Sequence, residues 1–432
     1  MSELKAGVGL SRKWDAREAG REVAETALEK LEGEKPKFFL LFSTIHYEKY
    51  GGFQELLNGV WEVLPEGTPL IGGTVAGFMN NYGCFARGAT ALTLFHPNMY
   101  VQIGFGKGTK RNPTKAVQNC IHSMQDKSLE REKEQHQGLL LLLVSGPLAF
   151  KIPGYGYRKF IDSDLINKSV KHAFRLSHYL LQKGLGREDE VFEAFVKRKS
   201  HCKMILGTSV DDYKGISNYL FFNKQVLRNA VVALNVEIPD AEIDVCTTHG
   251  MKKTGIKFKI TKISKDGHII HEINHRPAVS ELYDLLGWSK NFLNEETILH
   301  RILYYPISVN RFGKEVPVVM PAIIKESIIT PCLVNRGDAS IMTVNGLDLI
   351  DAVDKGFNLL QVKKPAVCIC SACLTIMQTL GYRLDTVREK VDSHLKNAPF
   401  VIFFCAGEGS YSPKRGVIYA NMSYNFGVIG YQ

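Results

Sequence analysis

Uninterrupted apolar runs of strand length alternate with amphipathic segments along the chain. FFLLFS from Phe38 and LLLLLVS from Leu139 stay apolar until their final serine, which is typical of strands buried on both faces. Residues 14–32 and 52–64 instead place apolar residues at helical spacing, and Gly and Pro follow each segment. The pattern predicts alternating helices and strands, in an α/β to α+β protein with mixed sheets.

The same order of elements occurs twice in the N-terminal part. The octapeptide IGGTVAGF at 71–78 recurs in altered form as LGTSVDDY at 206–213, and an apolar strand follows Arg87 or Arg228. From these arginines onward the offset between the copies stays at 141 to 142 residues over two strands. We therefore predict two copies of one α/β unit that pack on each other, with a pocket at their seam.

A chain of 432 residues is too long for one ordinary core, so more than one domain is expected. We predict an N-terminal domain over residues 1–288, with its two copies at about 1–110 and 111–288. The second copy carries an insertion at 147–200, which begins with a Gly/Tyr-rich loop and is expected to be peripheral. A separate domain of alternating strands and helices is predicted for residues 289–432.

Composition indicates a folded protein of a reducing compartment. Most of the nine cysteines lie within apolar runs, where a reduced Cys packs as a small hydrophobe. The N-terminus lacks an apolar signal core, and the longest apolar stretch, Leu139–Val144, is far too short to cross a membrane. We therefore predict a cytoplasmic protein without a membrane span. The formal charge is +10, but the basic residues are dispersed, so nucleic acid is not expected as a partner.

Five segments resemble motifs of the FIST family. PLIGGTVAGF at 69–78 and LGTSVDDY at 206–213 are similar to the family's two Gly-rich turns. Residues 248–250 with 260–287 are similar to its long signature, which combines a His-Gly pair, a Thr-Lys strand, a hairpin and a Pro-Ala helix start. CICSAC, which contains Cys370, and AGEGSYSPKRGVIYANMS resemble its C-terminal elements. The resemblance covers essentially the whole chain and implies a FIST N domain, internally duplicated, followed by a FIST C domain.

This resemblance implies a small-ligand-binding sensory or signal-transduction protein that acts through a protein partner. Proposed ligands of the family include amino acids, so an amino acid or a similar small anion-bearing metabolite is expected. Some members bind haem, and others follow an F-box. The first strand is expected from Ala6, so no F-box is expected here. The chain departs from the family's C-terminal pattern, with Ser423 in place of Thr and Ala372-Cys373 in place of Gly-Arg.

We expect the ligand site where the two turns meet the strand ends of the C-terminal part. Glycines let a ligand approach the backbone closely, and exposed N–H groups can hold a carboxylate or phosphate. Hydroxyl, carboxyl, imidazole and amide groups at strand ends can bind further polar groups of a ligand. The predicted ligand-binding residues are Gly72, Gly73, Thr74, Gly207, Thr208, Ser209, Asp211, Asp212, His249, Cys370, Glu408 and Asn421.

Other interpretations of these residues stay open. Each Gly-rich turn is also explained as a tight turn after a strand, and His249 as an exposed loop histidine. His249 is also a candidate axial ligand of a haem-binding gas sensor. An uncharacterised enzyme using Cys370, His249 or Glu408, and a protein-interaction adaptor using the insertion at 147–200, are further alternatives. No catalytic motif is present, so no catalytic residue is predicted and catalysis itself stays open.

Cysteines in the C-terminal part offer a possible metal site. Cys368, Cys370 and Cys373 form CxCxxC, and Cys405 could add a fourth thiolate. A metal-binding knuckle needs a turn between its ligands, and no Gly or Pro supplies one here. A continuous strand cannot point all three thiolates at one ion. We therefore predict no metal, and no other cofactor.

Overall fold

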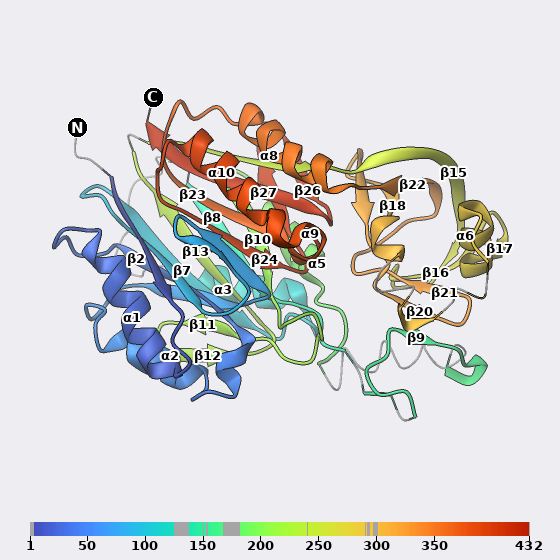
Figure 1. Ribbon diagram of the computed structural model, residues 1–432, viewed down its shortest axis with the longest axis horizontal. Helices are drawn as coiled ribbons and strands as arrows, with labels where there is room; N and C mark the ends of the chain where they lie inside the picture. Colours follow the sequence, from blue (N-terminus) through green and yellow to red (C-terminus); the bar gives the residue numbers. More distant parts are fainter. Residues whose placement is uncertain are drawn as a thin grey trace.

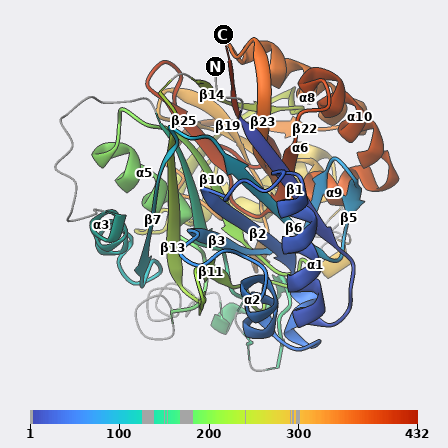
Figure 2. The same ribbon diagram turned by 90° about the vertical axis from the view of Figure 1, so that its left-hand side faces the viewer.

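The computed structural model has a larger body with three six-stranded sheets and a smaller lobe with a nine-stranded sheet (Figure 1). The chain starts and ends in the body, and both views place the two termini near each other (Figure 2). Leu4 N donates a hydrogen bond to Tyr431 Oη there, at 2.5 Å. The structure describes residues 4–124, 138–149, 151–152, 154–166, 182–239, 241–289, 291, 294–296 and 301–431.

The first sheet of the body is centred on one parallel pair of strands. This pair is β2 and β3, and all other neighbours in the sheet are antiparallel. The apolar run FFLLFS lies within β2, which is buried along its whole length. In order across the sheet, the strands are β1 (Lys5–Ser11), β6 (Ala89–Phe95), β2 (Phe38–Thr44), β3 (Leu70–Val75), β11 (Leu220–Phe222) and β12 (Gln225–Leu227).

The other two sheets of the body repeat this order. Each again contains one parallel pair, followed by an antiparallel hairpin. The second sheet runs β7 (Tyr100–Lys107), β13 (Ala230–Glu237), β8 (Leu139–Ser145), β10 (Lys203–Ser209), β25 (Gly409–Ser412) and β26 (Gly416–Tyr419). The third runs β14 (Glu242–His249), β27 (Ser423–Tyr431), β23 (Lys364–Cys373), β24 (Phe400–Cys405), β4 (Gly77–Asn80) and β5 (Gly83–Phe85).

Each hairpin joins a different sheet from the one that contains the strands just before and after it in the chain. Hairpin β4–β5 joins the third sheet, β11–β12 joins the first and β25–β26 joins the second. The three sheets therefore exchange hairpins in a cycle. The backbone repeats as well: Gly88, Asn229 and Met422 precede β6, β13 and β27, and all three have positive φ (132°, 47° and 57°). Two sequence copies were predicted, and the strand order occurs in three sheets.

Helices cover the outer faces of the three sheets. The first sheet carries α1 and α2, which pack so closely that a Cβ on Gly20 would overlap the carbonyl of Leu56. Asp15 and Asn345 cap α1 and α8 through their side chains, and Asn112 Oδ1 accepts from Lys115 N at the start of α3. The helices are α1 (Ala16–Glu29), α2 (Phe53–Trp61), α3 (Pro113–Met124), α5 (Glu188–Arg198), α8 (Gly346–Leu359), α9 (Leu374–Leu380) and α10 (Leu384–Leu395).

The insertion predicted at 147–200 is not peripheral throughout. Its last part forms α5, which covers the second sheet as α2 covers the first. Val191, Phe192 and Phe195 of this helix are fully buried. Residues 167–181 of the predicted insertion lie outside the described ranges. The prediction failed for α5 because its counterpart in the first copy, α2, has an unrelated sequence.

The lobe is inserted between β14 and α8 of the third sheet's unit. Its strands come from both sides of residue 288, so the strand pairing does not follow the predicted division between residues 288 and 289. The lobe contains helix α6 (Ala278–Leu286) and the short helix η4 (Ile302–Tyr304). Its strands are β15 (Lys252–Ile263), β16 (Ile269–Ile273), β17 (Arg276–Pro277), β18 (Ile307–Arg311), β19 (Lys314–Val318), β20 (Ala322–Ile324), β21 (Ser327–Ile329), β22 (Gly337–Thr343) and β9 (Phe160–Ile161).

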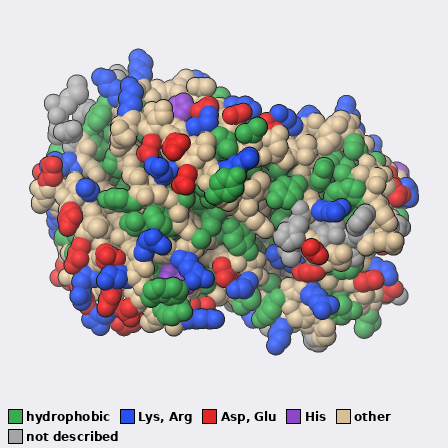
Figure 3. Space-filling view, viewed as in Figure 1, with side chains coloured by type: hydrophobic (Ala, Val, Ile, Leu, Met, Phe, Trp, Pro, Cys, Tyr) green, Lys and Arg blue, Asp and Glu red, His purple; other side chains and the backbone are tan. Residues whose placement is uncertain are grey.

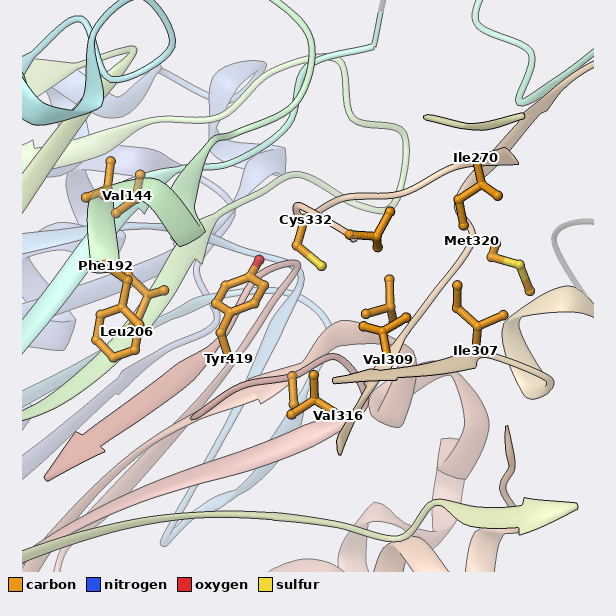
Figure 4. Close-up of a cluster of buried hydrophobic side chains, with 14 of the residues drawn as sticks. Val144, Phe192, Leu206, Ile270, Ile307, Val309, Val316, Met320, Cys332 and Tyr419 are labelled. Atoms are coloured by element: carbon orange, nitrogen blue, oxygen red, sulfur yellow. The ribbon is translucent and has the colours of Figure 1, made fainter. Parts of the chain in front are cut away.

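One buried apolar cluster continues from the body into the lobe (Figure 4). Phe192 and Tyr419 lie on the body side, and Ile307 and Val309 lie on the lobe side. An ion pair also joins the two parts, since Arg311 Nη2 of β18 lies 3.0 Å from an Asp189 carboxylate oxygen of α5. None of the helices within the described ranges is both long and apolar enough to cross a membrane.

Candidate functional site

The ends of the three inner strands β3, β10 and β24 meet at the centre of the body. Each strand end donates a backbone N–H to the next strand, so that the three bonds close a ring. The bonds are Val210 N to Thr74 O (2.9 Å), Ala76 N to Phe404 O (2.9 Å) and Ala406 N to Thr208 Oγ1 (3.0 Å). The two Gly-rich turns of the sequence are therefore neighbours, as the predicted seam requires.

The centre of this ring is filled by side chains rather than open. Gly207 lacks a side chain there, and the ring of Phe403 occupies the space beside it, whereas Tyr219 and Leu220 lie closest to Gly73. A Cβ on Gly207 would overlap the Phe403 ring, and Phe42 stacks on the same ring. The remaining gap, whose lining includes Phe42, Gly73, Thr74, Ser209 and Phe403, has an empty volume of about 150 Å³ and is too narrow to admit water. The predicted seam is thus a packed core in this structure.

Other residues of the turns have structural partners. Gly72 faces β2, where a Cβ would overlap the Leu41 carbonyl. The Asp211 carboxylate accepts from three successive backbone N–H groups, Gly215, Ile216 and Ser217. Asp212 Oδ2 lies on the surface, 2.7 Å from Lys214 Nζ. Neither aspartate lies at the strand-end ring with a free carboxylate. Thr74 Oγ1 accepts from Tyr219 N, and Ser209 Oγ donates to Asn218 Oδ1.

Three of the predicted residues lie apart from the ring. His249 ends β14, where its Nδ1 accepts from Met251 N at 3.3 Å; burial and nearby Lys355 lower its pKa. Cys370 is buried in β23, where burial raises its thiol pKa well above the usual range. Asn421 ties the body to the lobe, because its Oδ1 accepts from Val319 N at 3.2 Å. The structure therefore does not gather the predicted residues into one open pocket.

Glu408 has the most unusual environment of the predicted residues. It is fully buried after β24, and neither carboxyl oxygen makes a hydrogen bond of good geometry within the described part of the chain. The Cys373 thiol and the Ser423 amide lie beside it. Burial raises the pKa of this carboxyl well above its usual range, and the negative charge of Glu188 acts in the same direction. Burial therefore favours the neutral, protonated form of Glu408 over its carboxylate.

Glu188 and Lys110 extend this buried polar group toward α3. Burial raises the pKa of Glu188 to about 7, and neighbouring Asp189 adds to the shift. Its Oε1 accepts from Tyr419 Oη at 2.9 Å. Lys110 is also fully buried and donates to the carbonyls of Gly146 (2.8 Å) and Gly184 (3.2 Å). Burial lowers its pKa to about 8. These bonds indicate that Lys110 anchors loops rather than a ligand.

A cavity of about 450 Å³ lies elsewhere, on the surface of the first unit. It opens to solvent and is formed by three separate segments of the chain. These are the β1–α1 loop, the helical turn after β2, and the end of hairpin β4–β5 with the link to β6. The lining residues are Arg12, Trp14, His46, Cys84, Phe85, Ala86, Arg87 and Gly88.

The cavity is cationic and aromatic. The Arg87 guanidinium lies 5.5 Å from the centre of the Trp14 ring, and that of Arg12 lies 5.9 Å from the Phe85 ring. Within the described ranges neither arginine has a carboxylate within 4.0 Å, although such pairs are common elsewhere in the chain. Nδ1 of His46 lies 2.7 Å from Thr44 Oγ1. Burial, with the charge of Arg87, lowers the pKa of His46 to about 4, so it is neutral at pH 7.

Sequence reasoning noted Arg87 only as a member of the repeat and missed Arg12, Trp14 and His46. A usable signal was that Arg87 has a counterpart in Arg228. The two arginines differ in their surroundings: Arg228 lies over Tyr219 and forms an ion pair with Glu48, whereas Arg87 has no ion pair among the residues that the structure describes. The matched position of the two arginines before β6 and β13 was therefore a signal for Arg87 alone.

Among the residues that the structure describes, no set of three or more His, Cys, Asp or Glu side chains is arranged to hold a metal ion. The nine cysteines are all free thiols. Basic and acidic side chains are interspersed over the face shown in Figure 3, with no broad surface of one sign.

The family of the chain follows from its sequence. The model of the FIST N domain matches residues 37–276, more than half of the chain, so the protein belongs to the FIST family. No curated protein matches it significantly. Among solved structures, it is similar to cyanuric acid hydrolase from A. caulinodans, with 7% identity, full coverage of both chains and a TM-score of 0.36. A likeness of that size supports no conclusion about activity.

Proposed function

We propose that this protein is a small-ligand-binding sensory protein whose ligand is a small anion-bearing metabolite, bound in the cavity of Arg12 and Arg87. One observation carries the proposal: an open cavity of about 450 Å³ holds two guanidinium groups without a carboxylate partner in the described ranges. FIST domains are associated with small-ligand sensing and signal transduction, which agrees with this use of the cavity.

The charge of the cavity favours an anion over a zwitterion. Each guanidinium offers five N–H donors, and hydrogen bonds to charged groups contribute about 1.5–3 kcal/mol each. An amino acid would find donors for its carboxylate, but the lining contains no acidic side chain for its ammonium group. A carboxylate- or phosphate-bearing metabolite without an amine therefore fits the lining better than an amino acid.

The position of the cavity suggests how binding reaches the rest of the molecule. Phe85 and Cys84 belong to the hairpin that completes the third sheet, while Arg12 and His46 belong to the first unit. A ligand that contacts both groups links two of the three sheets. We propose that this link alters a surface read by a protein partner in the cytoplasm. The ligand-binding role predicted for the central turns is replaced in this proposal by the surface cavity.

Native mass spectrometry of the purified full chain tests the proposal. We expect a co-purified small anion in the wild-type protein that is lost when Arg12→Gln and Arg87→Gln are combined. Arg228→Gln is the matched control, because it removes the equivalent arginine of the second unit and should keep the ligand. Retention of the same mass in the double variant would contradict the proposal.

Two rival functions are separated by simple measurements. A Soret absorption band in the purified protein would support the haem-binding gas sensor. An enzyme that uses Cys370 is disfavoured by its environment, because a buried thiol with a raised pKa is not a nucleophilic thiolate at neutral pH. The buried carboxyl of Glu408 remains the group to test first if turnover of any metabolite is detected.

A further inference from the structure

The aromatic residues of the cavity indicate the shape of its ligand as well as its charge. Trp14 is 52% exposed although it is the largest side chain of the lining. Its ring is held in place by edge contacts with His46 (5.8 Å between ring centres) and Tyr50 (4.9 Å). An indole that is fixed at its edges and exposed over about half its surface is a preformed stacking platform.

Both arginines are exposed residues, and the guanidinium group of each lies over an aromatic ring of the lining. Arg87 is associated with Trp14, and Arg12 with Phe85. Such stacking restrains a planar guanidinium and leaves its N–H donors free for a second planar group. A carboxylate conjugated with a ring lies in the plane of that ring and so presents both features in one flat body. A flat anion can then bind arginine at its charged end and stack on indole with its ring.

The other lining residues, His46, Cys84, Ala86 and Gly88, add no charge to the cavity. His46 is neutral at pH 7, so it adds a hydrogen-bonding imidazole but no further positive charge. With only the two arginines charged, the cavity matches one or two negative charges rather than the polyphosphate of a nucleotide. The remaining apolar lining, from Phe85 and Ala86, favours an unsubstituted hydrocarbon or heteroaromatic face.

From this arrangement we infer that the ligand is a planar aromatic carboxylate, recognised by Arg12 and Arg87 through its charge and by Trp14 through its ring. This inference rests on the proposed function, since it specifies the chemical class of the anion in the same cavity. It adds planarity as a separate requirement, which can fail while anion binding holds.

Isothermal titration calorimetry of the full chain with three probes separates the two requirements. Benzoate is planar and anionic, cyclohexanecarboxylate is anionic but not planar, and benzamide is planar but neutral. We expect benzoate to bind at least about tenfold more tightly than cyclohexanecarboxylate, and benzamide to show no binding. Equal affinity for the two anions would overturn the inference but leave the proposed function intact. Binding of neither anion, or equal binding of benzamide, would overturn both.

Variants of Trp14 assign the preference to its ring. Trp14→Leu should remove the preference for benzoate while leaving the affinity for cyclohexanecarboxylate unchanged, and Trp14→Phe should retain most of it. Tyr382→Leu is the control, because this tyrosine is 84% exposed and lies outside the cavity lining. An unchanged preference in Trp14→Leu, with wild-type thermal stability showing that the variant is folded, would overturn the role of the indole.

Discussion

The rings of Phe42 and Phe403 stack with their centres 4.4 Å apart and their planes at 14°. Phe42 belongs to β2 of the first sheet and Phe403 to β24 of the third, so the pair joins two sheets at the centre of the body. Phe403 also fills the space that Gly207 leaves on the second sheet. One aromatic side chain thereby contacts all three sheets where their strand ends converge.

Removal of the Phe403 ring should lower the free energy of unfolding. Phe403→Ala would leave a cavity next to Gly207, which has no side chain to fill it. Phe→Ala substitutions in cores cost about 3–5 kcal/mol. We expect a loss of that size in the free energy of unfolding, measured by urea denaturation. Phe312→Ala, at a 50% exposed position, is the control and should change stability by less than about 0.5 kcal/mol. A loss below about 1 kcal/mol for Phe403→Ala would show that the sheets close over the space.

The ion pair between lobe and body provides a second test. Arg311 and Asp189 have side chains that are 6% and 1% exposed, and Leu333 N also donates to Asp189 at 3.0 Å. Asp189→Ala would leave the buried Arg311 guanidinium with only the more distant Glu193 carboxylate, at 3.9 Å, so we expect a loss of about 3–5 kcal/mol in urea denaturation. Asp212→Ala removes the exposed pair with Lys214 and should cost less than about 1 kcal/mol. A loss of less than about 1 kcal/mol for both variants would contradict a stabilising role of the Arg311–Asp189 ion pair.

Stability should depend on pH through Glu188. Its folded pKa of about 7 lies above its ordinary value of 4.5, so the folded state binds this proton more tightly than the unfolded state does. The stabilisation is fully present below about pH 4.5 and is lost as pH rises through 7. Glu188→Gln should therefore flatten the pH profile of the unfolding free energy between pH 5 and 8, relative to wild type. An unchanged slope in the variant would contradict this environment for Glu188.

The pKa of His46 should respond to the charge in the cavity. Burial is the main cause of its low pKa, and the nearby charge of Arg87 adds to it. Arg87→Gln should raise the pKa of His46 from about 4 toward its ordinary value of 6.5, and so should an anion bound at Arg87. NMR titration of the His46 ring protons measures this shift. Arg228→Gln should leave the titration unchanged, and a similar shift there would show that Arg87 is not the source.

The sequence was informative where local pattern decides the structure. The apolar runs at 38–43 and 139–145 are β2 and β8, and the amphipathic segments at 14–32 and 52–64 contain α1 and α2. Gly88, Asn229 and Met422 show why the third repetition of the strand order escaped notice. The three positions share a backbone conformation, yet only the first is glycine, so no common residue marks them.

Pairing between strands far apart in the sequence could not be predicted from local pattern. The division near residue 288 followed the apparent end of a repeat, but β16 pairs with β21 and β15 with β22 across that point. The cavity is formed by three segments, and its wall from hairpin β4–β5 is in place only because that hairpin joins the third sheet. The predicted site assumed that glycines at strand ends leave open space, whereas Phe403, brought in from the C-terminal part, fills it.

The exchange of hairpins also has a consequence for how the protein is made on the ribosome. β4 ends at Asn80, and its partner β24 starts at Phe400, 320 residues later. At about 5–20 residues per second, β24 follows β4 out of the ribosome after roughly 16–64 s. Until then hairpin β4–β5, which forms one wall of the cavity, has no sheet to join. The nascent chain therefore presents this edge to other molecules for most of its synthesis, and the cavity takes shape only when translation is nearly complete.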